Sequence, residues 1–145
     1  MTPKSKKQND LSLTPAPQAD EKVIPAKGKR ILIVEDERPL SHALEMKLGH
    51  EGYETRVVTN GTDALTALEK DRFHMILLDL IMPVMDGFAV LAALKARKNT
   101  VPVIVLSNLG QTEDQAKTKE LGAVDYFVKS NTPIADIVAR VKTIL

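Results

Sequence analysis

Short apolar runs alternate along the chain with longer stretches in which apolar residues recur every three or four positions. The runs are rich in β-branched residues, which is typical of buried strands, and the longer stretches have the spacing of amphipathic helices. Strands are predicted over residues 30–34, 54–58, 73–78, 101–106 and 124–128. Helices are predicted over 39–49, around 64–68, around 87–94, over 112–121 and over 134–144.

This alternation of strand and helix predicts an α/β fold. Strands that are apolar on both faces belong to a parallel sheet that helices cover on both sides. Because crossovers between parallel strands are right-handed, five such units give a doubly wound (βα)5 sheet. Ligands of these sheets bind at the carboxyl ends of the strands, so the residues that follow each strand are the first place to look for chemistry.

The first residues of the chain follow neither pattern. Residues 1–30 contain seven basic and three acidic residues, four of the eight prolines and no aromatic residue. Such a segment buries too little apolar surface to offset the entropy cost of ordering its backbone. We therefore expect residues 1–28 to be a flexible basic tail and residues 29–145 to form one folded domain.

Composition excludes several classes of protein. The chain has 145 residues and no cysteine, which excludes disulfide scaffolds, cysteine-ligated zinc, iron–sulfur clusters and thiol nucleophiles. The net charge of +1 gives no global attraction to nucleic acid. Neither a secretory signal nor an apolar run of the ~18–20 residues that cross a bilayer is evident, so a cytoplasmic location is expected.

Polar residues of complementary chemistry follow four of the five predicted strands. They are Glu35 and Asp36 after the first, Asp79 after the third, Ser107 and Asn108 after the fourth, and Lys129 after the fifth. Three crowded carboxylates repel one another unless a hard cation such as Mg²⁺ binds between them. A lysine and a hydroxyl opposite can hold phosphoryl oxygens, and Asp79 is then placed as a nucleophile that forms an aspartyl phosphate.

These strand ends resemble the receiver domain of bacterial two-component response regulators. The resemblance covers roughly residues 29–145, and four motifs occur in the family's order. They are ILIVEDE (31–37), LLDLIMPVMDG (77–87), PVIVLS (102–107) and GAVDYFVK (122–129). The resemblance implies a flavodoxin-like sheet with strand order 2-1-3-4-5.

The resemblance also implies a magnesium site at this edge of the sheet. Glu35 and Asp36 correspond to the family's acidic pair, and Asp79 corresponds to the phosphoacceptor and a metal ligand. The backbone carbonyl of Ile81 corresponds to a further ligand. From the residues alone, the acidic pair could instead cap the helix that begins near Pro39.

The remaining motif residues correspond to the family's phosphate-binding and switch groups. Lys129 corresponds to the phosphate-binding lysine, and Ser107 and Tyr126 correspond to the switch hydroxyl and the switch aromatic residue, although tyrosine is also an ordinary strand residue. The resemblance implies that the protein is not a turnover enzyme, because members of this family catalyse only their own phosphorylation and slow dephosphorylation. The implied donor is a histidine kinase or a phosphotransfer protein.

Phosphorylation in this family changes a partner-binding face, which here consists of the fourth strand, the fourth helix and the fifth strand. The chain ends at Leu145, so we expect a single-domain receiver with no DNA-binding domain and no membrane partner. The sequence departs from the family in three places, one of which is the apolar pair Ile81 and Leu109 beside the site. Ser130 replaces a usual proline after the lysine, and Asn108 replaces a small residue after the switch hydroxyl.

Two other functions lack residues that they require, and a third remains compatible with the sequence. A haloacid-dehalogenase-like enzyme needs a second aspartate two residues after the nucleophile, and Ile81 stands there. A flavodoxin-like nucleotide-binding module needs a glycine- or hydroxyl-rich loop after the first strand, where three acidic residues occur instead. A receiver fold that signals through protein contact without phosphorylation stays open because of Asn108 and Ser130.

Overall fold

The computed structural model describes residues 28–145, and the tail predicted over 1–28 lies outside this range except for Gly28. The strands are β2 (Arg30–Val34), β3 (Glu54–Val58), β4 (Met75–Leu78), β5 (Val103–Ser107) and β6 (Asp125–Val128). The helices are α1 (Arg38–His50), α2 (Gly61–Lys70), α3 (Gly87–Ala96), α4 (Thr112–Glu120) and α5 (Ile134–Ile144), with a 3₁₀ turn, η2 (Lys129–Asn131), after β6.

The strands form one parallel sheet in the order β3-β2-β4-β5-β6, which confirms the predicted 2-1-3-4-5 arrangement. Because every strand runs the same way, all five carboxyl ends lie along one edge of the sheet. Four of the strands, β2, β4, β5 and β6, are consecutive neighbours in this order. The residues that follow these four strands are therefore brought side by side.

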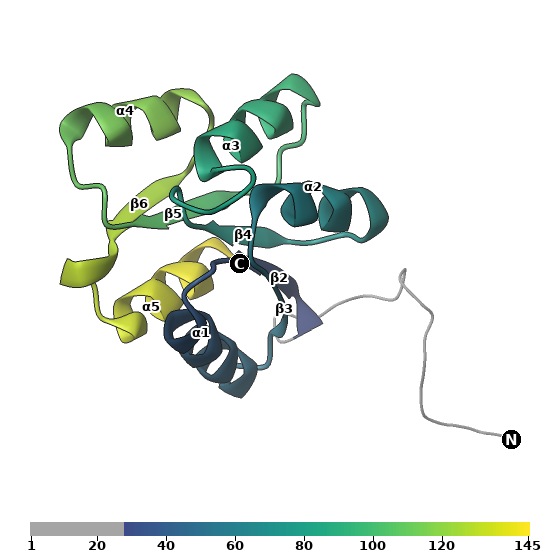
Figure 1. The fold of residues 1–145 in the computed structure, drawn as a ribbon. Coiled ribbons are helices and arrows are strands. Elements are labelled where there is room, and N and C mark those ends of the chain that lie inside the picture. The colour runs from purple at the N-terminus through teal and green to yellow at the C-terminus, as the bar shows by residue number, and fades with distance from the viewer. Residues whose placement is uncertain (1–27) are drawn as a thin grey trace, which may run out of the picture.

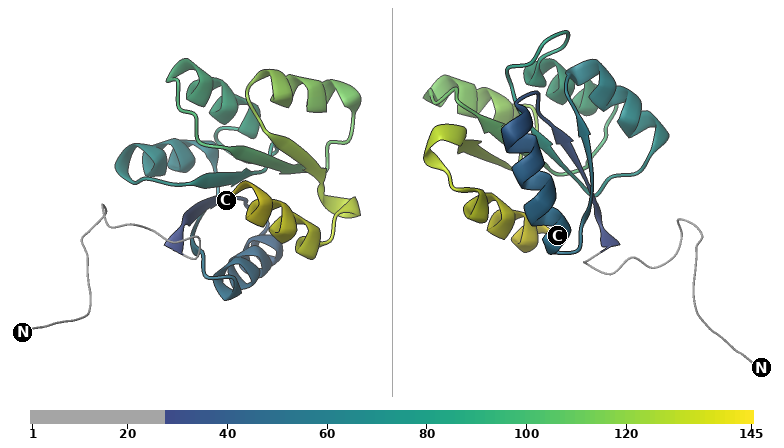
Figure 2. Two further views of the ribbon diagram at one scale, coloured as in Figure 1. Left: turned by 180° about the vertical axis from the view of Figure 1, so that it is seen from behind. Right: turned by 60° about the horizontal axis from the view of Figure 1, so that its bottom comes forward.

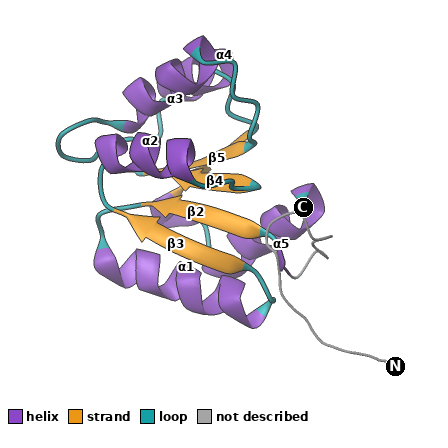
Figure 3. Ribbon diagram, turned by 90° about the vertical axis from the view of Figure 1, so that its right-hand side faces the viewer, coloured by secondary structure: helices purple, strands orange, loops and turns teal. Residues whose placement is uncertain are grey.

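Helices cover both faces of the sheet (Figures 1 and 2). On one face α1 and α5 pack against alternate strand residues such as Ile31 and Ile33, and on the other α2 and α3 pack against Leu32 and Val34. The sheet thus lies between two apolar layers. Figure 3 shows the strands, in orange, between the two layers of helices. No helix within residues 28–145 is both long enough and apolar enough to span a membrane.

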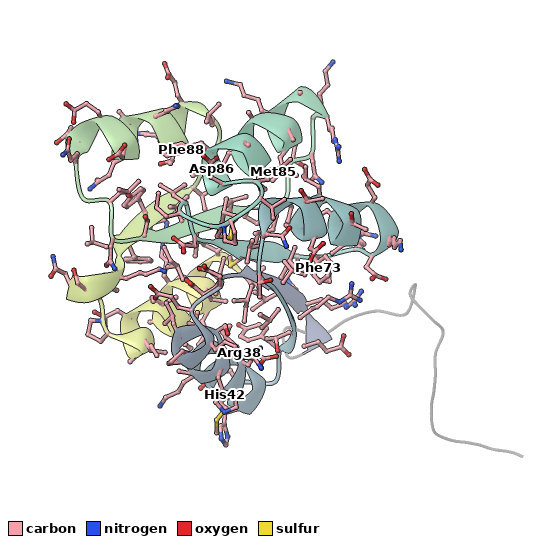
Figure 4. All side chains as sticks on the ribbon, viewed as in Figure 1. Arg38, His42, Phe73, Met85, Asp86 and Phe88 are labelled. Carbon is pink, nitrogen blue, oxygen red and sulfur yellow. The ribbon has the colours of Figure 1, made fainter. Side chains whose placement is uncertain are left out.

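The third strand begins later than its apolar run predicts, at Met75 instead of Phe73. The backbone N–H of Arg30 donates to His74 Nδ1 at 3.0 Å, and the N–H of His74 donates to the carbonyl of Arg30 at 2.8 Å. The guanidinium groups of Arg30 and Arg56 lie over the ring of Phe73, 5.0 and 5.5 Å from its centre; Figure 4 labels Phe73. The His74 side chain therefore accepts the Arg30 N–H, which a backbone carbonyl would otherwise accept if the strand began earlier.

The fourth helix is the least buried of the five. Thr118 is its one buried residue, whereas each of the other helices buries at least three. Polar contacts with α3 supplement this packing: Lys117 Nζ lies 4.6 Å from the ring centre of Phe88, and Lys95 Nζ donates to the carbonyl of Glu120 at 2.9 Å. Helix α4 is therefore held on the fold largely by polar contacts near the protein surface and less by buried apolar side chains.

Glycine is required where α3 begins. A Cβ atom at Gly87 would lie 2.3 Å from the carbonyl oxygen of Asp79 and 2.8 Å from the Cα of Leu80. Both contacts are with backbone, which cannot rotate away. The close approach of α3 to the end of β4 therefore fixes the backbone on which Asp79 stands.

We expect Gly87→Ala to destabilise the protein by about 2–3 kcal/mol, because the added methyl group overpacks a backbone contact. Gly49→Ala is the matched control, since a Cβ there meets no atom within 4 Å and the position is helical. Alanine's higher helix propensity should make that variant more stable by about 0.5 kcal/mol. Urea unfolding measures both, and equal effects of the two substitutions would contradict this account.

The contact of His74 with Arg30 predicts a pH dependence of stability. Burial, followed by the positive charges of Lys29 and Arg72, lowers the pKa of His74 below its ordinary value. The unfolded chain therefore binds this proton at higher pH than the folded protein does. The contribution of His74 to the free energy of unfolding is fully present above about pH 6.5, the ordinary pKa of histidine. It is lost as the pH falls through the pKa of His74 in the folded protein, by at most ~1.4 kcal/mol per pH unit.

His74→Asn should remove this part of the loss between pH 7 and pH 5, because an amide oxygen can accept from Arg30 but does not titrate. His42→Asn, on the outer side of α1, is the matched control and should keep the wild-type dependence (Figure 4). Chemical unfolding at the two pH values gives the difference. An unchanged difference in His74→Asn would show that His74 does not cause it.

Candidate functional site

The polar residues singled out in the sequence meet at the carboxyl edge of the sheet. Glu35 and Asp36 follow β2, Asp79 follows β4, Ser107 ends β5, and Lys129 follows β6. The neighbouring order of these strands is what brings them together, since the positions span almost a hundred residues of sequence. Each strand end thus contributes one part of a single site.

Three carboxylates form a cluster within this site. One oxygen from each of Glu35, Asp36 and Asp79 lies within 4.8 Å of the other two, with Glu35 and Asp79 buried and Asp36 exposed. Oxygen ligands at this density suit a hard divalent cation. The cluster therefore has the donor set, and one exposed side, that a magnesium ion needs.

Helix capping does not account for the acidic pair. The first helix begins at Arg38, its N-cap residue is Glu37, and no side chain forms a cap hydrogen bond there. Instead, Glu35 Oε2 accepts a hydrogen bond from the backbone N–H of Glu37 at 2.9 Å. This bond orients the Glu35 carboxylate toward the site.

Lys129 is the positive centre of the site. Its Nζ lies 2.8 Å from Glu35 Oε1 and 3.0 Å from Asp79 Oδ2, and its side chain is only 9% exposed. A third carboxylate, Glu37 Oε1, lies 3.3 Å from the same nitrogen. One ammonium group thus offsets part of the repulsion among four neighbouring acids.

The electrostatics reflect this crowding. Burial raises the pKa of the Glu35 and Asp79 carboxyls above their ordinary values, and the Lys129 ammonium only partly opposes the effect. Burial also lowers the pKa of Lys129, but its bonds to Glu35 and Asp79 outweigh burial and leave that pKa raised. Lys129 therefore stays charged, and the negative charge around it favours binding of a further cation.

The hydroxyl groups of the site meet at Leu109. Ser107, which is fully buried, accepts a hydrogen bond at Oγ from the Leu109 N–H at 3.2 Å. The Tyr126 hydroxyl donates to the Leu109 carbonyl, and burial raises the pKa of that hydroxyl. The two residues predicted as a switch are therefore joined through one backbone residue.

Two contacts of the site were not predicted from the sequence. Glu37 contacts Lys129, and the run Glu35-Asp36-Glu37 was the signal that a third acid follows the first strand. Asn108 Oδ1 accepts a hydrogen bond from the Ser130 N–H at 3.0 Å. A contact between a side chain and a distant backbone group leaves no pattern in the sequence.

The residue chemistry agrees with comparison to known proteins. A family model described as "Response regulator receiver domain" matches residues 31–142. The transcriptional regulatory protein PcoR of Escherichia coli is 38% identical over 117 residues, which are 81% of this chain and 51% of PcoR. The chain spans about half the length of the curated relatives it matches.

Solved structures give the same result. The receiver domain of the Francisella response regulator 1452 superposes with a TM-score of 0.77 at 27% identity, covering 81% of this chain and 96% of that domain. The response regulator TrrA of Thermotoga maritima, in complex with Mg(2+)-BeF, has a TM-score of 0.70 at 29% identity, with coverage of 81% and 99%.

The crowded acids predict that Asp79 destabilises the fold at neutral pH. Asp79→Asn keeps the shape of the side chain but removes a buried charge whose pKa is raised by burial. We expect this variant to be more stable than the wild type in metal-free buffer at pH 7, within the roughly 0.5–2 kcal/mol that single stabilising substitutions give. Urea unfolding in the presence of a chelator measures the change.

Asp86→Asn is the matched control. Asp86 is the N-cap of α3, where it accepts from the Ala89 N–H at 2.9 Å, and asparagine caps a helix equally well. Its unfolding free energy should stay within about 0.5 kcal/mol of the wild type. A loss of stability in Asp79→Asn would mean that the ion pair with Lys129 outweighs the cost of burying the carboxylate.

Proposed function

Because the chain belongs to the response regulator receiver domain family, we propose that it accepts a phosphoryl group on Asp79 and thereby changes its partner-binding face. Receiver domains are the phosphorylation-dependent signalling domains of two-component systems and have histidine kinases as partners. The observation that carries the proposal is the buried Lys129 ammonium group, which contacts Asp79 and Glu35 inside a cluster of acids. This arrangement suits an anionic group added at Asp79.

Magnesium is the proposed cofactor. Receiver domains bind Mg²⁺ at an acidic pocket, and TrrA was crystallised with Mg(2+)-BeF. Glu35, Asp36 and Asp79, with the backbone carbonyl of Ile81, would hold the ion in this chain. When bound, it would screen the negative phosphoryl donor from the negative nucleophile.

The proposed reaction is a direct transfer to a carboxylate. An oxygen of Asp79 attacks the phosphorus of a phosphohistidine on a kinase or phosphotransfer protein. The new O–P bond forms as the N–P bond breaks, and the electron pair of that bond leaves with the histidine nitrogen. Lys129 then exchanges its contact with the Asp79 carboxylate for one with a phosphoryl oxygen, which keeps its charge paired.

Ser107 and Tyr126 are the proposed switch residues. Ser107 is the last residue of β5, and β5 pairs with β4, the strand that Asp79 follows. A move of Ser107 toward a phosphoryl oxygen would release the Leu109 N–H and disturb the Tyr126 contact with the same residue. We propose that the face formed by β5, α4 and β6 binds a downstream target, and Figure 1 shows α4 and β6 together at one side of the molecule.

The test is intact mass after incubation with magnesium and acetyl phosphate. The wild type should gain one phosphoryl group that hydroxylamine removes, because an acyl phosphate is labile to that nucleophile. Chelation of magnesium and Asp79→Asn should each abolish the gain. Asp86→Asn, the same chemical change at an exposed helix cap, should keep it.

Lys129→Met tests the role of the ammonium group separately, since methionine keeps the apolar part of the side chain and removes the charge. We expect its rate of phosphorylation to fall at least tenfold while the fold is retained. A folded wild type that gains no phosphoryl group from acetyl phosphate or from a histidine phosphodonor would contradict the proposal. Signalling by contact alone, without phosphorylation, would then be favoured.

A further inference from the structure

A hydrogen bond joins the two loops that carry the proposed phosphate-binding groups. Asn108 directly follows Ser107, and Ser130 directly follows Lys129. The Ser130 N–H donates to Asn108 Oδ1 at 3.0 Å, although the two residues lie 22 positions apart. The backbone beside Ser107 is therefore tied to the backbone beside Lys129.

The turn after Lys129 depends on this bond for one of its backbone groups. Ser130 lies in the 3₁₀ turn η2, and N–H groups in the first turn of a helix have no partner within the helix. On the other side of the turn, Thr132 Oγ1 donates to the carbonyl of Val128 at 2.8 Å. Only a residue with an N–H at position 130 can bind Asn108, and proline could not.

The loop around Asn108 is held at three successive residues. Ser107 Oγ accepts from the Leu109 N–H, Asn108 binds the turn of Lys129, and the Leu109 carbonyl accepts from Tyr126. Of these contacts, only that of Asn108 reaches the lysine turn. Its side chain is exposed, so it contributes by this bond and not by filling the core.

We propose that Asn108 is a positioning residue that fixes the spacing of Ser107 and Lys129 through Ser130, and so prolongs the life of the phosphorylated state. The inference rests on the proposed function, since it concerns the same site. Two donors held at a fixed spacing bind phosphoryl oxygens without further ordering. Two loops that move independently would admit water to the acyl phosphate more often.

The first test needs no phosphorylation. Amide hydrogen exchange of Ser130, followed by NMR in the unmodified protein, should be about threefold to tenfold faster in Asn108→Leu and Asn108→Ala, the range for loss of one hydrogen bond. Asn108→Asp keeps an acceptor oxygen and should retain protection. Ser130→Ala keeps the N–H and removes only the hydroxyl, so protection at position 130 should also be retained. Unchanged exchange in Asn108→Leu would overturn the proposal.

The second test measures the lifetime of the phosphorylated protein by mass after the phosphodonor is removed. Leucine matches the bulk of asparagine but has no acceptor, so Asn108→Leu should shorten the lifetime about threefold to tenfold, as should Asn108→Ala. Ser130→Ala should keep the wild-type lifetime. A wild-type lifetime in Asn108→Leu together with a short one in Asn108→Ala would show that bulk shields the site, and would overturn the positioning role.

The two tests separate this inference from the function on which it rests. Failure of the wild type to become phosphorylated would overturn the proposed function, and the effect on lifetime with it. Normal phosphorylation with unchanged lifetimes in all the Asn108 variants would overturn the positioning role alone.

Discussion

The Lys129 ammonium group is the interaction on which this edge of the sheet depends. Glu35 and Asp79 are buried beside each other at the ends of adjacent strands, where their charges repel. A single cation that contacts both carboxylates offsets part of this repulsion and of the cost of burying them. The same cation sits at the start of the turn that leads into α5, so the charge balance and the path of the chain are set together.

Most of the fold could be predicted from the sequence because parallel strands need continuous apolar runs. The runs at 30–34 and 54–58 match β2 and β3 residue for residue. The run at 101–106 is shifted instead: β5 begins at Val103, and Pro102, which has no N–H to give to the ladder, precedes it. Ser107 is accordingly the last residue of the strand and not the first of the loop.

The positions of the site residues could be predicted for the same reason, but their contacts could not. A residue directly after a parallel strand must lie at the carboxyl edge, so Asp79 and Lys129 were expected to meet. The bonds of Asn108 to Ser130 and of Tyr126 to Leu109 each involve a backbone group. Every residue has such groups, and the choice among them depends on loop geometry that no residue type specifies.

Leu109 links the two proposed switch residues. Its N–H binds Ser107 and its carbonyl binds Tyr126, so neither side chain can move without leaving an unpaired group on the same residue. Such a shared partner favours two arrangements of the loop over a continuum of intermediate ones. The proposed movement of Ser107 would therefore also disturb the contact that Tyr126, on the neighbouring strand β6, makes with Leu109.

The shallow packing of α4 has an evolutionary consequence. Thr118 is its one buried residue, so substitutions elsewhere on this helix remove little apolar contact and change the free energy of folding only slightly. Mutations can therefore accumulate on its outer surface while the sheet and the acidic site stay intact. The sequence of this surface can therefore change at little cost to folding, and with it the chemistry that the proposed partner-binding face presents.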